Sequence, residues 1–323
     1  MKKLLFILMA ALIAPVVNAE EIVLESATCS LHGTLEMPES SGPPPLVLII
    51  PGSGPTDRDG NIRGFQGKNN SLKYLAEALS RNGVASLRFD KRGVGRSVSS
   101  QLREEYIKPE TYIDDVTAWM DYLRSRDNFH NLFILGHSEG SLIGMAAAQR
   151  GDVNGFISIS GAGRSAPEII IEQTRTQLPS DLMRETERII GELKAGRMVK
   201  SPPPSLNLLF RESAQPYLIS WFKYEPAKEM AKLDIPVLIV QGTTDIQVTV
   251  DDAKRLHEAG RKSRLIIIEG MNHVLKHVPN DSQKQLASYG DPSLPVSEEL
   301  VNVLLKFIKS SESDGPDRVA GGA

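Results

Sequence analysis

Apolar positions follow two different periods along this chain. Six short, nearly uninterrupted runs of Val, Ile and Leu, bounded by Gly, Pro or polar residues, predict β-strands at residues 46–50, 84–89, 132–135, 156–158, 237–241 and 265–269. Elsewhere apolar residues recur every three or four positions, as in residues 71–82 and in the stretch from Tyr112 to Leu123, and this spacing predicts amphipathic helices. Such strands, separated by helices, indicate an α/β fold: a mostly parallel sheet with helices on both faces, which binds ligands at the carboxyl ends of its strands.

The interval between the fourth and fifth predicted strands is much longer than one crossover helix requires. Ser165 and Glu168 within it have the spacing of a capping box that begins a helix. We interpret residues 164–232 as a helical cap inserted over the sheet; extra helices packed elsewhere are the alternative, because the length of an insertion fixes no position. The main domain is then residues 20–310, and the polar, Gly-rich residues 311–323 are expected to form a disordered tail.

The beginning of the chain has the layout of a secretory signal peptide. Lys2 and Lys3 precede an apolar run of about a dozen residues, too short to span a bilayer comfortably, and Val17-Asn18-Ala19 offers a small-residue cleavage site. We therefore expect residues 1–19 to be removed and the protein to be secreted or periplasmic; an uncleaved anchor or a buried N-terminal helix is the alternative. No later stretch reaches membrane-spanning length, so no integral membrane span is expected after signal removal.

Composition narrows the function classes further. The chain is 41% hydrophobic and 24% charged, which is ordinary for a globular protein, and its formal net charge is −3. Loss of Lys2 and Lys3 with the leader makes the remainder more acidic, so neither nucleic acid nor an anionic membrane is an expected partner. Cys29 is the only cysteine, which excludes a disulfide framework, and we expect it to be a plain strand residue rather than a reactive thiol.

The strongest chemical motif is Gly136-His137-Ser138-Glu139-Gly140. By itself a Gly-x-Ser-x-Gly match is weak evidence, but this one follows a predicted strand and precedes an apolar segment that is typical of a helix. A sharp strand-to-helix turn lifts a serine hydroxyl above a sheet, and its glycines let strand and helix approach closely. Ser138 is therefore the candidate nucleophile, and a Gly-rich turn with an idle serine is the alternative.

A serine hydroxyl needs a base, and the base needs a carboxylate that fixes its tautomer. His273 lies just beyond the last predicted strand, whereas His277 should point in a different direction. Asp245 follows the fifth predicted strand and is favoured as the acid. Asp251 and Asp252 are the competing candidates. They are expected to lie at the start of the next helix, where the helix dipole favours acidic residues.

For the remaining histidines, namely His32, His130, His137 and His257, a surface or packing role is the expectation. The order Ser138, Asp245, His273 is the chain order of the α/β-hydrolase triad. All three residues are predicted to lie at strand ends, as catalysis at one edge of a parallel sheet requires.

Acyl transfer also requires hydrogen-bond donors where negative charge develops. The backbone N–H of Glu139, at the start of the elbow helix, is one candidate. The second should come from the loop after the first predicted strand, where the N–H of Ser53 is favoured and that of Gly54 is the alternative. In the same loop Asp57 and Arg58 are expected to pair structurally rather than take part in catalysis.

With these residues in view, the chain resembles the α/β-hydrolase superfamily over nearly its whole mature length, and most closely bacterial capped esterases and serine aminopeptidase-like hydrolases. The motifs that carry the resemblance are residues 51–60, 89–97 and 136–140, together with Gly242 to Asp245 and Asn272-His273. The Asp-x-Arg-Gly-x-Gly-x-Ser segment beginning at Asp90 is similar to one that shapes a loop in these enzymes. Pro51 departs from the pattern, because the oxyanion loop of the family often begins with histidine.

The resemblance implies hydrolysis of small-molecule carboxylic esters through an acyl-enzyme, with no metal or organic cofactor. Gly93-Val94-Gly95 lacks the third glycine of a dinucleotide-binding fingerprint. A serine peptidase or aminopeptidase is the first alternative, since this fold also cleaves amides, and a thioesterase lies within the ester class. A binding protein that kept the fold is a second alternative, against which the complete triad argues. The sequence leaves the oligomeric state open.

Overall fold

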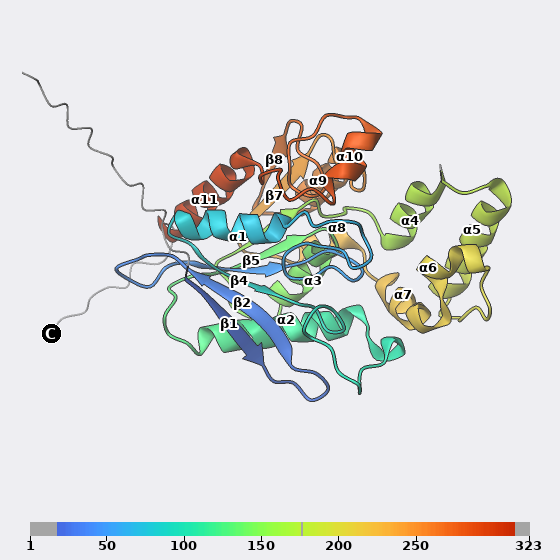
Figure 1. The fold of residues 1–323 in the computed structure, drawn as a ribbon, viewed down its shortest axis with the longest axis horizontal. Helices are drawn as coiled ribbons and strands as arrows, with labels where there is room; N and C mark the ends of the chain where they lie inside the picture. The colour runs from blue at the N-terminus through green and yellow to red at the C-terminus, as the bar shows by residue number, and fades with distance from the viewer. Residues whose placement is uncertain (1–17, 176, 314–323) are drawn as a thin grey trace, which may run out of the picture.

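The six predicted strands form adjacent parallel strands of one sheet. The computed structural model describes residues 18–175 and 177–313, and within them the strands lie in the order β1-β2-β4-β3-β5-β6-β7-β8 (Figure 1). The strand bounds are β1 Asn18–Leu24, β2 Leu31–Met37, β3 Leu46–Ile50, β4 Ala85–Phe89, β5 Leu132–His137, β6 Gly155–Ile159, β7 Val237–Gly242 and β8 Ser263–Ile268. The prediction of a mostly parallel sheet is confirmed, and β1 and β2 extend it as antiparallel strands at the β4 edge.

The antiparallel pair was not predicted as such, and it corrects the expectation for Cys29. Cys29 is buried, but it lies in the connection between β1 and β2 rather than within a strand. The first residues of β1, Asn18 and Ala19, belong to the expected signal peptide, whose residues 1–17 lie outside the described part of the chain. Residues from Glu20 onward, which would remain after the expected cleavage, also pair with β2.

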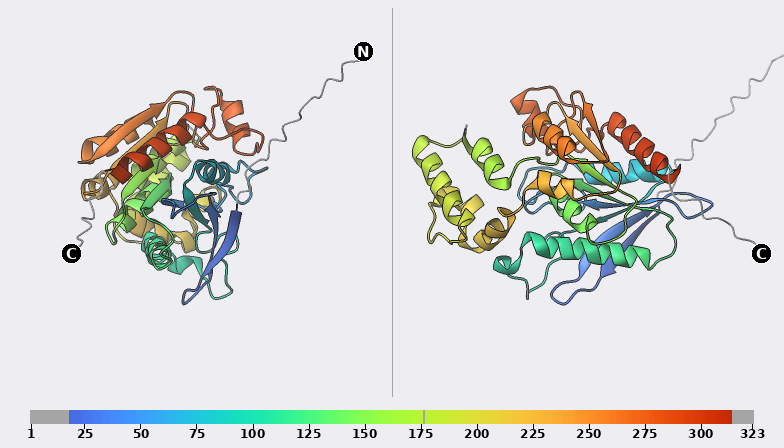
Figure 2. Two further views of the ribbon diagram at one scale, coloured as in Figure 1. Left: turned by 90° about the vertical axis from the view of Figure 1, so that its left-hand side faces the viewer. Right: turned by 180° about the vertical axis from the view of Figure 1, so that it is seen from behind.

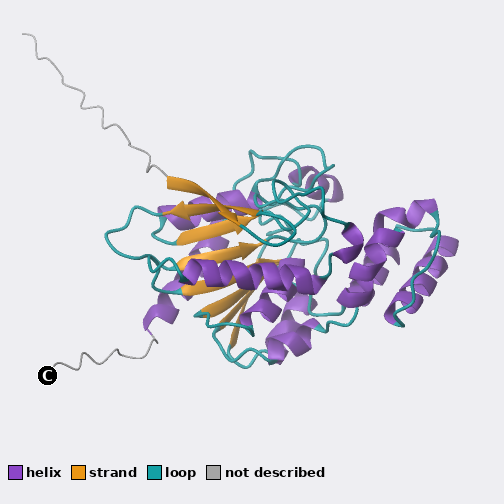
Figure 3. Cartoon of the chain, turned by 90° about the horizontal axis from the view of Figure 1, so that it is seen from below, coloured by secondary structure: helices purple, strands orange, loops and turns teal. Residues whose placement is uncertain are grey.

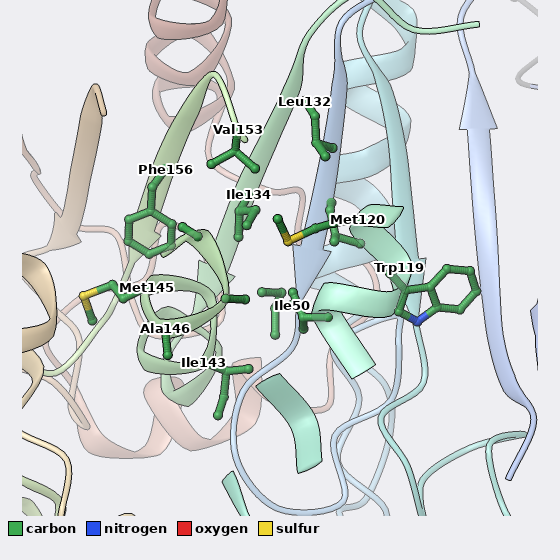
Figure 4. Close-up of a cluster of buried hydrophobic side chains, with 14 of the residues drawn as sticks. Ile50, Trp119, Met120, Leu132, Ile134, Ile143, Met145, Ala146, Val153 and Phe156 are labelled. Atoms are coloured by element: carbon green, nitrogen blue, oxygen red, sulfur yellow. The ribbon is translucent and has the colours of Figure 1, made fainter. Parts of the chain in front are cut away.

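Successive residues of the parallel strands enter opposite faces of the sheet, as the strand period of two requires. In β3, Leu46, Leu48 and Ile50 join one apolar cluster while Val47 and Ile49 join the other. The helices α2, α3, α8 and α9 supply the first cluster, and α1 and α11 supply the second, so the sheet is covered on both faces (Figure 2, right). Figure 4 shows part of the first cluster, to which Trp119 and Met120 of α2 and Ile134 of β5 belong.

The helices that cover the sheet have the following bounds: α1 Ser71–Arg81, α2 Pro109–Arg124, α3 Glu139–Ala148, α8 Pro226–Ala231, α9 Val250–Ala259 and α11 Glu298–Ser313. A further short helix, α10 (Ser282–Ser288), lies between β8 and α11. Helix α11 continues to Ser313, so residues 311–313, expected in the tail, are helical; residues 314–323 lie outside the described residues. Among the helices that the structure describes, none is long and apolar enough to cross a membrane.

Four helices between β6 and β7 stand apart from these layers, at one end of the sheet (Figures 1 and 3). They are α4 Ala166–Arg175, α5 Ser180–Lys194, α6 Asn207–Phe210 and α7 Gln215–Trp221. Their apolar side chains form a cluster of their own, which includes Ile189, Ile190, Leu193 and Phe210. The expected insertion of residues 164–232 also contains α8, but Met230 of that helix packs in the sheet's own cluster. We therefore use the word cap for residues 164–225.

Candidate active site

Ser138 occupies a sharp turn between β5 and α3. Its φ of 57° and ψ of −123° are rare for a residue with a side chain, and its N–H donates to the carbonyl oxygen of Ile159 at 3.0 Å. A Cβ at position 136 would collide with the backbone at Gly140, and a Cβ at position 140 would collide with the carbonyl of Ile50. Glycine at both positions thus allows the strained turn that presents the Ser138 hydroxyl beyond the sheet edge.

The loops after β7 and β8 bring Asp245 and His273 together. His273 Nδ1 lies 2.9 Å from Asp245 Oδ2 and 3.1 Å from Oδ1. Because a carboxylate only accepts hydrogen bonds, the neutral form of the ring carries its proton on Nδ1 and its lone pair on Nε2. The acid is oriented by the N–H groups of Gln247 and Val248, which both donate to its Oδ1.

Asp245 is almost completely buried, and this affects its ionisation in two opposing ways. Burial alone would raise the pKa of its carboxyl, but attraction to His273, the hydrogen bond from that ring and the two backbone N–H groups outweigh it and lower the pKa to about 2. Asp245 is therefore a carboxylate at neutral pH. The structure places Asp245 and His273 as an acid–histidine pair at the same edge of the sheet as Ser138.

His137 connects this pair to the elbow, a role that the sequence did not suggest. Its Nε2 donates to the backbone carbonyl of His273 at 2.8 Å, and the centroids of the two imidazole rings are 4.9 Å apart. Burial, with a contribution from nearby His273, lowers the pKa of His137 to about 3, so the ring is neutral. His137 directly precedes Ser138, so this hydrogen bond holds the backbone of His273 next to the elbow. His137 therefore does more than fill space in the core.

The two backbone groups expected to stabilise an oxyanion lie beside Ser138. A Cβ at Gly52 would lie 3.2 Å from the Cβ of Ser138, which shows how closely the loop after β3 approaches the elbow. Ser53 and Glu139 line the same cavity as Ser138. Glu139 is the first residue of α3, so its N–H has no partner within the helix.

The cavity above Ser138 has a volume of about 100 Å³ and lies between the sheet and the cap. The loops at the sheet edge contribute Ser53, Ser138, Glu139, Leu142, Ala162, Gln247 and Val248. The cap contributes Arg164, Ala166, Ile169, Ile170, Gln173 and Trp221, and Pro226 of α8 completes the lining. The walls on the cap side are therefore largely apolar.

The side chain of Glu139 is buried and already occupied. Its Oε1 accepts a hydrogen bond of 2.6 Å from the hydroxyl of Tyr217 in the cap helix α7, and its Oε2 lies 3.5 Å from Nζ of Lys91. Lys91 also donates to the carbonyl oxygen of Gly52 and lies over the ring of Tyr112 at 5.1 Å. This buried network, which no sequence pattern indicated, connects the loop after β3, the elbow and the cap.

Charged residues of the loop after β3 have structural roles, though not the pairing expected from the sequence. Arg58 pairs with Asp90 at 2.9 Å and with Glu21 of β1 at 3.0 Å, instead of pairing with Asp57. Asp57 accepts hydrogen bonds from the backbone N–H groups of Asp59 and Asn61. Asp90, which begins the loop motif after β4, therefore ties that loop to the one that carries Ser53.

The competing candidates for the triad lie elsewhere. Asp252 caps α9 with Thr249 and binds Arg164, whose Nη2 is 2.8 Å from its Oδ2; Asp252 therefore anchors the beginning of the cap. Asp251 is exposed and pairs with Lys254. The ring of His277 contacts the hydroxyl of Ser297. Within residues 18–175 and 177–313, no cluster of three or more His, Cys, Asp or Glu residues could hold a metal ion.

Comparison with known families gives a match that includes the elbow. A family model described as "Serine aminopeptidase, S33" matches residues 62–215. This stretch contains Ser138 and most of the cap but ends before Asp245 and His273. The match therefore covers the candidate nucleophile, whereas the other two residues of the proposed triad rest on the geometry alone.

Relatives that are similar in sequence include an esterase and a proline iminopeptidase. Esterase EstD of Thermotoga maritima is 28% identical over 249 residues, which are 76% of this chain and 58% of EstD. The chain thus spans less than two thirds of that relative. A proline iminopeptidase of Lactobacillus helveticus is 23% identical over 269 residues, covering 73% of this chain and 85% of the peptidase.

Est1E from Butyrivibrio proteoclasticus, solved with ferulic acid bound, superimposes with a TM-score of 0.60 at 20% identity and covers 90% of this chain and 99% of Est1E. At this level of identity the likeness concerns the fold alone. It confirms the architecture expected from the order and spacing of the sequence motifs.

Proposed function

We propose that this chain is a serine hydrolase of the α/β-hydrolase superfamily, which hydrolyses carboxylic esters of small, uncharged acyl groups through an acyl-enzyme on Ser138. The α/β-hydrolase fold is observed, whereas the serine-hydrolase activity and the class of bond that it cleaves are what we infer. The observation that carries the inference is the small, largely apolar cavity over Ser138, whose single acid is already engaged by Lys91 and Tyr217.

In the proposed mechanism, Nε2 of His273 removes the Ser138 proton as Oγ attacks the ester carbonyl. Asp245 keeps Nδ1 protonated and stabilises the imidazolium that forms. The N–H groups of Ser53 and Glu139 hold the oxyanion, and His273 then protonates the departing alcohol. A water activated by the same ring releases the acid and restores Ser138.

The cavity favours an ester over an aminopeptidase substrate. An enzyme that removes N-terminal residues must bind a cationic amine, which calls for an unpaired acid beside the nucleophile. Among the described residues that line the cavity, Glu139 is the only acid, and its two oxygens contact Tyr217 and Lys91. An ester has no such charge to satisfy, so the cavity needs no further polar group to bind it.

The size of the cavity limits the acyl group. A dry apolar cavity of about 150 Å³ is known to bind benzene, and the one above Ser138 measures about 100 Å³. Acetyl to butyryl groups fit such a space, whereas a long fatty acyl chain needs the cap to move. We therefore infer a preference for short acyl chains.

A panel of p-nitrophenyl esters from acetate to palmitate tests this proposal. We expect hydrolysis that is fastest for the short chains and that Ser138→Ala abolishes. Ser141→Ala is the matched control, because Ser141 lies on α3 and its hydroxyl contacts Ser158, and we expect it to remain active. Absence of turnover for every ester, or faster release of p-nitroaniline from aminoacyl anilides than of p-nitrophenol, would contradict the ester assignment.

We also propose that the chain is exported and that the mature protein begins at Glu20. Cleavage there leaves Glu21 in place, and Glu21 pairs with Arg58 of the oxyanion loop and with Arg96. Edman sequencing of the protein recovered from the medium or periplasm is expected to begin Glu-Glu-Ile. A chain that retains Met1 and stays in the cytoplasm would refute the proposal.

A further inference from the structure

Lys91 is a buried cation that the proposed mechanism does not use. Its side chain is 3% exposed, and it reaches from the loop after β4 toward the elbow. Burial lowers the pKa of its ammonium, an effect that Glu139 opposes. Charged groups are rarely buried unless their partners compensate for lost water, so the identity of these partners indicates what the lysine does.

One of the partners is the carbonyl oxygen of Gly52. That carbonyl and the N–H of Ser53 belong to the same planar trans peptide, in which the two groups point in opposite directions. When Lys91 fixes the carbonyl, it also fixes the direction of the Ser53 N–H. A cation at the oxygen also draws electron density from the amide and strengthens its N–H as a donor.

The ionic partner of Lys91 is Glu139, the residue that directly follows Ser138. The backbone N–H of Glu139 is the second proposed donor, and its carboxylate lies 3.5 Å from the ammonium of Lys91. Lys91 is therefore linked to both proposed donors: it binds the carbonyl of the peptide that carries the Ser53 N–H, and it lies next to the side chain of Glu139. Gly52 lies so close to Ser138 that a Cβ added to it would be 3.2 Å from the Ser138 Cβ. A rotation of the Gly52–Ser53 peptide would therefore disturb the geometry at the nucleophile.

We propose that Lys91 is a positioning residue of the oxyanion hole, which aligns and polarises the Gly52–Ser53 peptide while Glu139 and Tyr217 hold it in place. The proposal rests on the proposed function, because it assigns a task in the same acyl transfer. Tyr217 extends the connection to the cap, since its hydroxyl donates to Glu139 at 2.6 Å. The cap thereby contributes to transition-state stabilisation as well as to the walls of the cavity.

The decisive test compares Lys91→Met and Lys91→Gln with wild type in the hydrolysis of p-nitrophenyl acetate. Methionine keeps the bulk but cannot donate, so we expect kcat to fall about 100-fold while KM stays within about twofold, since a displaced donor affects the transition state more than the ground state. Glutamine can donate a neutral hydrogen bond, so it should restore part of the loss. Active sites are counted with a fluorophosphonate so that kcat refers to folded enzyme.

A boronic acid and a substrate-like ketone provide a second readout. The boronate mimics the tetrahedral intermediate, so its affinity is expected to weaken in parallel with kcat in Lys91→Met, while affinity for the ketone changes little. If both variants bind the boronate as wild type does and keep kcat per active site, Lys91 is purely structural and the proposal is wrong. A wild type that neither hydrolyses esters nor reacts with fluorophosphonate would instead refute the proposed function.

Tyrosine variants test the connection to the cap and remain informative if Lys91→Met does not fold. Tyr217→Phe removes the hydrogen bond to Glu139, and we expect kcat to fall about 3- to 10-fold with little change in KM. Tyr224→Phe is the matched control, because Tyr224 donates to the carboxylate of Glu110, away from the nucleophile. Equal kcat values for the two variants would overturn the role of Tyr217.

Discussion

The sheet and the cap each have an apolar core, but they carry different parts of the chemistry. The residues proposed to react, Ser138, Asp245 and His273, all follow strands of the sheet, whose clusters fix them through buried backbone. The cap, whose cluster includes Phe210, contributes one wall of the cavity and the hydroxyl of Tyr217. We infer from this difference that the sheet supplies the reacting groups, while the cap shapes the space for the substrate and supports the oxyanion site through Tyr217.

The largest expected effect is a difference in kcat between variants of two aspartates: Asp245, which follows a strand of the sheet, and Asp252, which anchors the cap. Asp245→Asn leaves the shape intact but no longer fixes the His273 tautomer, so we expect kcat to fall about 10⁴-fold. Asp252→Asn weakens the contact with Arg164 at the beginning of the cap and should lower kcat less than about 10-fold. Steady-state hydrolysis of p-nitrophenyl acetate measures both, and a larger loss for Asp252→Asn would reverse the assignment of the acid.

Truncating one buried aromatic residue in each core should have different consequences: in the sheet it should destabilise the whole protein, and in the cap only the cap. Phe156 in β6 and Phe210 in α6 are both completely buried, and removing either ring is expected to cost about 3–5 kcal/mol locally. Phe156→Ala should lower the melting temperature of the whole protein. Phe210→Ala should increase hydrogen exchange in residues 166–222 while the amides of β3 and β5 stay protected.

Loss of protection in β3 and β5 on Phe210→Ala would show that the cap and the sheet unfold as one unit. In that case the comparison between the two regions would fail at the level of stability. Labelling by a small fluorophosphonate gives an independent check, because it requires the sheet-borne site and not an intact cap wall.

Acid should destabilise the sheet through His137, since the cap residues 164–225 contain no histidine. The folded protein keeps His137 neutral because its pKa is lowered to about 3, whereas the unfolded chain takes up a proton near the ordinary histidine value of 6.5. The unfolded state thus binds more protons between these values, and this contribution to stability is present above pH 6.5 and is lost as the pH falls toward 3. At pH 5 the free energy of unfolding is expected to be about 2 kcal/mol lower than above pH 6.5 because of this residue.

Urea denaturation of wild type and His137→Gln at pH 7 and pH 5 measures this effect. Glutamine cannot take up a proton but can still donate to the carbonyl of His273. We expect the variant to lose less stability than wild type between the two pH values. Equal losses would show that His137 does not couple protonation to unfolding.

The smallest effect is expected in the cap wall. Ile170 lines the cavity, so Ile170→Ala should admit longer acyl chains and shift the ratio of butyrate to hexanoate hydrolysis by about 1 kcal/mol, or roughly fivefold. Ile171→Ala, one position along α4 and outside the lining, is the matched control. An unchanged chain-length profile in Ile170→Ala would argue that the cap does not select the acyl group.

The sheet was predictable from sequence because its central strands are buried on both faces and therefore appear as short apolar runs. β1 gave no such signal, since most of its residues are exposed and include Glu20 and Glu21. The helical spacing predicted helices in the insertion, but it could not show that α8 packs on the sheet. That distinction depends on where Met230 is buried, which is a tertiary contact.

The residues of the candidate site also fall into two groups, those that the sequence could predict and those that it could not. Ser138, Asp245 and His273 could be named because each follows a strand, and strand ends meet at one edge of a parallel sheet. Lys91, Tyr217 and the role of His137 depend on contacts between residues far apart in the chain, and such buried polar contacts leave no periodic pattern. The His137 bond, for instance, reaches 136 positions along the sequence.

The central claim is that Ser138 is a nucleophile activated by His273 and Asp245, and covalent labelling tests it most directly. Wild type, Ser138→Ala and His273→Ala would each be treated with a fluorophosphonate, digested and analysed by peptide mass spectrometry. We predict rapid modification of Ser138 in wild type, no modification of Ser138→Ala, and reaction slowed by at least about 10³-fold in His273→Ala. Equal labelling of all three proteins, or a folded wild type modified only at another residue, would contradict the account.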